Sequence, residues 1–151
     1  VVFINETVPY KPVAWLANQL YKEHYIAIPT KHHIVLDNSI KSIQYEWKVG
    51  TSWNHIKVNA TMDSREMDRG SLEEFIFEHY YGYTKISENV SQEYKINHPR
   101  WMVNDVTEKS VECDFSGMYG IPFSHLSNKK PDSIIIAEGS DISVDWKRQP
   151  F

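Results

Sequence analysis

The 151-residue chain has only one cysteine, Cys113, so no disulfide can form within it. It also has no apolar run close to the roughly 18 residues of a membrane-spanning helix, so no membrane insertion is expected. Its 16 basic residues are scattered and outnumbered by 20 acidic ones, a balance that does not favour nucleic-acid binding. Repeats, low-complexity tracts and long linkers are missing as well, which predicts one domain over residues 1–151.

No secretory signal is visible, so we expect a cytoplasmic protein whose three Asn-x-Ser/Thr sequons, at Asn5, Asn59 and Asn89, are chance matches. Cys113 lies in an alternating apolar and polar stretch, where a small buried residue is the simplest interpretation. The sequence predicts no cofactor. It is compatible with a homo-oligomer and does not specify the oligomeric state.

The sequence is rich in β-strand patterns. Ile43, Tyr45 and Trp47 alternate with polar residues, and Gly50 marks a hairpin turn after them. Further strands are predicted at 1–8, 25–36, 53–62, 82–87, 92–101 and 111–115, and residues 131–146 are predicted to form two short strands that meet at Gly139. With two amphipathic helices, this composition predicts an α+β fold built on a curved antiparallel sheet.

The first helix is predicted over residues 13–21, with Val13, Leu16, Ala17 and Leu20 on one face.

The second helix follows Ser71, which has the side chain of a good N-cap and is followed three residues later by Glu74 in a capping-box pattern. Its apolar face contains Phe75 and Ile76, and the spacing places His79 on that same face. We expect this face to point inward. His79 is then either a buried histidine that bonds its neighbours or a ligand-contacting, acid/base residue.

Two further candidates lie near the C-terminal half. His98 and Arg100 are predicted to project from the same strand face about 7 Å apart, a spacing suited to a small anion. Glu138 follows four apolar residues and is expected to be deep, with a partner or a raised pKa, which makes it a candidate general acid or base. The alternative is that Arg100 forms a structural ion pair with an internal acid such as Glu138.

Several histidines lie close together in the sequence, but their spacing does not support a metal site. His24, His32 and His33, with Glu23, lack the spacing of known zinc motifs, and successive strand residues such as His32 and His33 point to opposite faces. No metal is predicted.

Several stretches together resemble one known family. They are FINETVPYKPVAWLANQLYKEHY, GSLEEFIFEHYYGYT, EYKINHPRW, CDFSGMYGIPFSHL and PDSIIIAEGSDISV. In this order they resemble the signatures of the YqjF-like family of conserved bacterial proteins. The resemblance implies an acetoacetate decarboxylase-like fold, a strongly bent, barrel-like antiparallel sheet with flanking helices around a cavity, and it implies no particular reaction.

The decarboxylase chemistry requires a lysine with a depressed pKa inside the cavity. Lys129 and Lys130 form the only adjacent lysine pair, and they lie in a polar turn. Lys57, between two apolar residues, is the best remaining interior candidate. A Schiff-base mechanism is therefore not predicted.

The sequence as a whole favours a small-molecule binding protein with an aromatic-lined cavity. In this hypothesis Arg100 and His98 hold an anionic or carbonyl end of the ligand, and Tyr80, Tyr83 and Trp101 enclose the rest. One alternative is an enzyme that acts on a small organic acid through Glu138 or His79. Another is an interaction module without a ligand.

Overall fold

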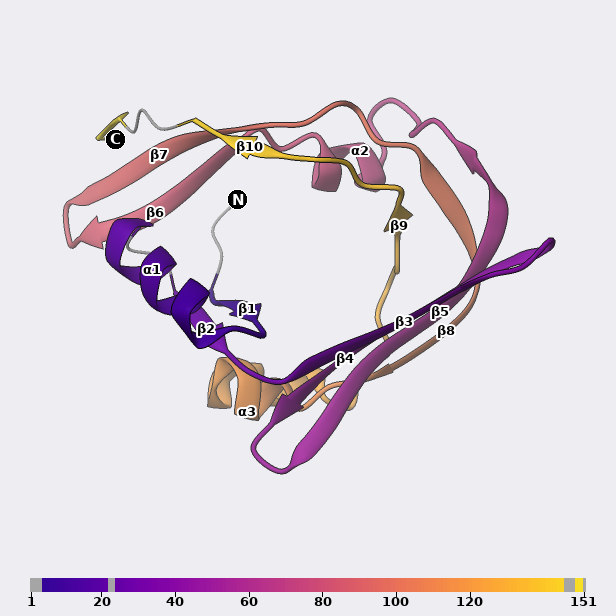
Figure 1. Cartoon of the computed structure of the whole chain (residues 1–151), viewed down its shortest axis with the longest axis horizontal. Helices are drawn as coiled ribbons and strands as arrows, with labels where there is room; N and C mark the ends of the chain where they lie inside the picture. Colours follow the sequence, from indigo (N-terminus) through magenta and orange to yellow (C-terminus); the bar gives the residue numbers. More distant parts are fainter. Residues whose placement is uncertain (1–3, 22–23, 146–148, 151) are drawn as a thin grey trace.

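The computed structural model describes residues 4–21, 24–145 and 149–150. Figure 1 shows the elements arranged in a ring, with a curled sheet along one side and a hairpin with a short helix along the other. The predicted α+β fold with a strongly bent antiparallel sheet is confirmed.

The curled sheet has five strands in the order β3-β4-β5-β8-β9, and every neighbouring pair is antiparallel. Its strands are β3 (Thr30–Leu36), β4 (Ile40–Val49), β5 (Ser52–Arg65), β8 (Val103–Glu112) and β9 (Ile136–Ala137). The hairpin turn predicted at Gly50 is confirmed: Val49 pairs with Ser52, and Gly50 has a φ of 58°, which favours glycine.

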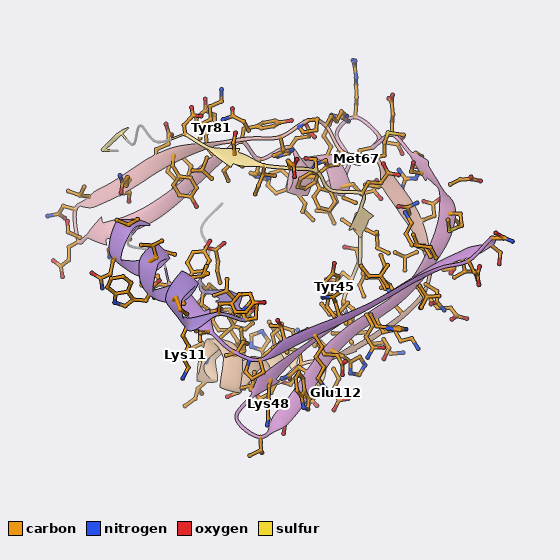
Figure 2. All side chains as sticks on the ribbon, viewed as in Figure 1. Lys11, Tyr45, Lys48, Met67, Tyr81 and Glu112 are labelled. Carbon is orange, nitrogen blue, oxygen red and sulfur yellow. The ribbon has the colours of Figure 1, made fainter. Side chains whose placement is uncertain are left out.

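The sheet has one apolar face and one polar face. Ile34 pairs with Ile43, which pairs with Val58, so these three side chains share a face. The buried cluster of Val58, Ala60 and Ile136 lies on this side. Tyr45, also on this face, lies inside the ring in Figure 2, whereas Lys48 and Glu112 from the other face lie outside.

A bulge in β5 bends the sheet. The register between β5 and β8 shifts on both sides of Ala60, so several residues of β5 lack a direct partner on β8. The side-chain amide of Asn104, on β8, donates to the carbonyls of Thr61 and Asp63 in this bulge, at 3.1 and 3.2 Å. Asn104 is only 3% exposed, and its own oxygen accepts from Lys41 Nζ at 2.9 Å. A single buried amide therefore satisfies backbone groups that the bulge leaves unpaired.

The rest of the ring consists of a hairpin, a small parallel pair and short helices. The strands are β1 (Glu6–Val8), β2 (Tyr25–Ala27), β6 (Tyr81–Ser87), β7 (Val90–Asn97), β10 (Ser143–Val144) and β11 (Gln149–Pro150). The helices are α1 (Lys11–Tyr21), α2 (Leu72–Phe77), α3 (Phe115–Tyr119) and the 3-10 helix η1 (Ile121–Leu126). β6, β10 and β11 all pair with β7, and β1 pairs with β2 in parallel. None of the helices in the described ranges has the length and apolarity to cross a membrane.

The protein exposes more surface than a compact chain of its size. The total accessible area is 10745 Å², whereas a compact monomer of this mass exposes about 7,900 Å². Part of the difference lies on the inner side of the ring, where Tyr45 remains 52% exposed. The apolar face of α1 is likewise half-exposed at Val13, Leu16 and Leu20.

Helix α2 departs from the expectation in length and in burial. Its N-cap is confirmed, because Ser71 Oγ accepts from the Glu74 N–H, but the Glu74 carboxylate reaches one residue further back than in a capping box and accepts from the Gly70 N–H. It nevertheless ends at Phe77, so His79 lies beyond the helix. Its apolar face is not buried against other side chains, since Phe75 is 69% exposed.

Candidate functional site

A pocket of about 600 Å³ lies between α2, the start of β6 and the end of β7. Its wall is mostly aromatic and aliphatic and comprises Phe75, Ile76, Phe77, His79, Tyr81, Ile96, His98, Trp101 and Ile142. This volume falls within the range of about 300–1,000 Å³ that is typical of small-molecule sites. The exposed apolar face of α2 thus forms one wall of a pocket.

Strand pairing brings the other walls to this helix. The Ile96 N–H donates to the Tyr80 carbonyl at 2.9 Å, and Tyr81 pairs with Lys95, so the segment after α2 runs beside the end of β7. Val144 of β10 pairs with Ile96 from the other side and places Ile142 nearby. The pocket is therefore assembled from three segments that are distant in the sequence.

His98 is held between two aromatic rings. Its ring stacks on Tyr80 at 4.8 Å and on Trp101 at 4.4 Å between centroids, with interplanar angles of 25° and 26°. Its Nδ1 donates to the Pro99 carbonyl at 2.8 Å. Trp101 in turn donates from Nε1 to Ser140 Oγ at 2.9 Å and contacts the edge of Phe77. These contacts fix the orientation of the imidazole.

His79 is held by its own helix end. Its Nδ1 donates to the Ile76 carbonyl at 3.0 Å, and its ring meets Phe75 edge-on at 5.0 Å. The carbonyl is one that the end of a helix leaves without an intrahelical partner. The two candidate histidines and Trp101 therefore lie in the wall of one pocket.

Arg100 does not share this pocket. Its guanidinium lies 2.8 Å from Glu74 Oε1 and 3.7 Å from Glu78 Oε2, and it donates to the Met67 carbonyl at 3.0 Å. The hydrogen bond with Glu74 raises the pKa of Arg100. The alternative of a structural ion pair agrees with these contacts, but the acids are Glu74 on α2 and Glu78 directly after it, and not Glu138.

His98 and Arg100, which were expected to bind one anion together, contact different groups in the structure. β7 ends at Asn97, because Pro99 has no N–H to continue the ladder. The His98 ring stacks on Tyr80 and Trp101, and the Arg100 guanidinium bonds Glu74 of α2.

Glu138 is exposed, so the prediction of a deep carboxylate is wrong. Its backbone N–H donates to the Met102 carbonyl at 3.0 Å, but β9 has already ended at Ala137. Gly139 follows with a φ of 72°, a conformation that favours glycine, and the chain turns away from the sheet there. Only Ile136 of the preceding apolar run is buried.

The tyrosine that lines the pocket is not one of the two that were predicted. Tyr80 donates to Glu78 Oε2 at 2.5 Å and Tyr83 donates to Glu93 Oε2 at 2.7 Å, and each carboxylate raises the pKa of its phenol partner. Neither residue lines the pocket, whereas Tyr81 does. Strand alternation puts Tyr81 and Tyr83 on one face of β6, but only the first residue of that strand lies beside α2.

The candidate metal ligands and lysines can also be placed. Among the described residues, no group of three or more His, Cys, Asp or Glu is arranged to hold a metal ion, and Glu23 lies outside those residues. His32 contacts Tyr45 on the inner face, while His33 pairs with Gln44 on the outer face. The interior position expected for Lys57 is wrong, because it is exposed on the outer face.

Lys41 was missed by sequence reasoning. It pairs with Ala60 on the apolar face and bonds Asn104 there.

Fold and pocket together define a curled antiparallel half-barrel with an apolar pocket at its open side. Residues 1–141 match the family model DUF2071, described as an uncharacterized conserved protein, and the chain belongs to this family. No curated protein and no solved structure matches the chain.

Proposed function

We propose that the protein binds a small, largely apolar organic molecule in the pocket beside α2. The observation that carries this proposal is the 69% exposure of Phe75, beside other large apolar side chains, in a pocket of about 600 Å³. Exposed apolar side chains that converge on one concavity are typical of a ligand site. The resemblance to the YqjF-like family and to the acetoacetate decarboxylase-like fold supports the same proposal.

The charges around the pocket favour an apolar ligand over an anion. Arg100, the residue expected to bind an anion, has its guanidinium engaged by Glu74, Glu78 and the Met67 carbonyl. An anion would have to displace the paired carboxylates of α2 to reach it. Contact with carbon atoms of the ligand therefore supplies most of the binding energy.

A second candidate function is proton transfer by His79 to or from a bound carbonyl compound. It is supported by the position of this imidazole in the pocket wall with one ring nitrogen already fixed by the Ile76 carbonyl. Glu138, the other proposed proton carrier, is exposed outside the pocket and gives this function no support.

Naphthalene titrated into the 15N-labelled protein tests the binding proposal. We expect saturable shifts confined to amides of the pocket wall. Replacing Phe75 with serine should weaken binding by about tenfold, since roughly 1.5–3 kcal/mol is associated with burying such a side chain.

Leu72→Ser provides the matched control. Leu72 is on the same helix and 55% exposed, but it does not line the pocket, so this variant should bind like the wild type. Shifts that do not saturate, or equal weakening by both substitutions, would show that the apolar surface is not a specific site.

A further inference from the structure

We infer that the ligand of this pocket carries a hydrogen-bond donor on an apolar body, as a phenol or an N–H heterocycle does. This inference rests on the proposed binding function and specifies its ligand class. It follows from the tautomer that the structure imposes on His79 and His98.

Both imidazoles have the same ring nitrogen engaged. Nδ1 of His79 lies 3.0 Å from the Ile76 carbonyl oxygen, and Nδ1 of His98 lies 2.8 Å from that of Pro99. A carbonyl oxygen can only accept, so each Nδ1 must carry the hydrogen. In the neutral ring, Nε2 is then an acceptor with a free lone pair.

Neither Nε2 is used within the part of the chain that the structure describes. No described residue donates a hydrogen bond to Nε2 of His79 or His98. Both residues line the pocket, and we infer that a ligand there reaches their Nε2 lone pairs. An occupant that offers no donor would leave them without a partner once water is displaced, which is costly in an apolar site.

The rings cannot easily turn to present the other nitrogen. Tyr80 and Trp101 cover both faces of His98, so only its edge is open. Phe75 meets His79 edge-on, and a flip of either ring would break its bond to the backbone carbonyl. The two Nε2 acceptors are therefore present in the pocket wall in the absence of a ligand.

The remaining polar groups do not favour an acceptor or an anion. The indole N–H of Trp101 is already donated to Ser140. Arg100 is paired with Glu74 and is not part of the wall. Apart from the indole of Trp101 and the phenol of Tyr81, the side chains of the described wall are hydrocarbon side chains and the two imidazoles.

Three probes of the same shape test this inference at pH 8: naphthalene, 2-naphthol and 2-naphthoate. We expect 2-naphthol to bind about tenfold more tightly than naphthalene, the size of one well-formed hydrogen bond, and naphthoate to bind most weakly. Equal affinities for naphthol and naphthalene, or preferential binding of naphthoate, would overturn the inference and leave apolar binding intact. If none of the three probes binds, both this inference and the proposed binding function are refuted.

Histidine variants locate the preference. His79→Phe and His98→Phe keep an aromatic ring, and the double variant should bind naphthol and naphthalene equally. His125 is the matched control, because its Nδ1 also donates to a backbone carbonyl, that of Pro122, but it lies outside the pocket. His125→Phe should retain the full tenfold preference, and its loss there would refute the assignment.

The tautomers of His79 and His98 can be measured in the protein without a ligand. Long-range 1H–15N correlation spectra of the wild-type protein should show protonated Nδ1 and unprotonated Nε2 for His79 and His98. The opposite pattern in both rings would overturn the inference even if the phenylalanine variants fail to fold.

Discussion

Asn104 is predicted to be the most sensitive polar residue of the sheet, and replacing it with alanine should destabilise the fold markedly. Its side chain is 3% exposed and lies in the bulge that bends β5. Its amide nitrogen has two hydrogens for the carbonyls of Thr61 and Asp63, at 3.1 and 3.2 Å, and its oxygen accepts from Lys41 at 2.9 Å. The substitution leaves all of these groups without their partner.

The expected loss in free energy of unfolding follows from the hydrogen bonds that the substitution removes. Each neutral hydrogen bond contributes about 1 kcal/mol net, and one to a charged group about 1.5–3 kcal/mol. Water can reach part of Lys41, which is only half-buried, so we take the low end of that range. The expected loss for Asn104→Ala is therefore about 3 kcal/mol, a large part of the roughly 5–15 kcal/mol that stabilises a typical domain.

Urea unfolding followed by tryptophan fluorescence measures this loss as a lower midpoint with an unchanged slope. Asn59→Ala is the matched control, because Asn59 is an asparagine of β5, the strand that pairs with β8, but its side chain bonds Glu108 on the solvent-exposed side, at 2.7 Å. That variant should lose less than about 1 kcal/mol. A loss below about 1 kcal/mol for Asn104→Ala, or equal losses for both variants, would refute the role of the bulge amide.

Other predictions concern the acidic helix and the single thiol. Hydrogen bonds from the Gly70 N–H and Arg100 lower the pKa of Glu74, so the stability they contribute is present above pH 4.5 and is lost as the pH falls through that lowered value. Glu74→Gln should therefore be less stable than the wild type at pH 7 in urea unfolding, with a gap that narrows below pH 4.5; a constant gap would contradict this. Arg65→Met should lower the melting temperature, because Arg65 binds both oxygens of Glu73 at 3.0 and 2.8 Å and ties α2 to β5, and an unchanged melting curve would show that this tie is dispensable. Burial, and to a lesser extent the charge of Asp114, raises the pKa of the Cys113 thiol, so iodoacetamide at pH 8 should alkylate the folded protein more slowly than the urea-unfolded chain. Equal alkylation rates would show that the thiol is not shielded.

Features that depend on neighbouring residues could be predicted from the sequence. The alternation of Ile43, Tyr45 and Trp47 predicted one apolar strand face, and the pairing with β5 confirms that they lie on one. The N-cap at Ser71 could be predicted because its bond to the Glu74 N–H forms within one helical turn.

The ion pairs of the site could not be predicted from the sequence. Arg100 was expected to bind an anion or to pair with Glu138, yet it pairs with Glu74 because the loop after β7 passes beside α2. Glu138 was expected to be buried because it follows apolar residues, but β9 stops one residue earlier. In both cases the partner depends on where a distant element ends.

The sequence by itself determined the strand and hairpin around Gly50, the helix cap at Ser71 and the presence of His79 on an apolar stretch, because these follow from spacing along the backbone. It did not determine β8, which runs from Val103 to Glu112 where a strand was predicted only over 111–115. Only the tertiary structure decided that His79, His98 and Trp101 line one pocket, that Tyr81 joins them in place of Tyr80 and Tyr83, and that Arg100 does not. The physical reason is that strand pairing across the ring places Ile96 beside Tyr80, and such a long-range contact leaves no periodic trace in the sequence.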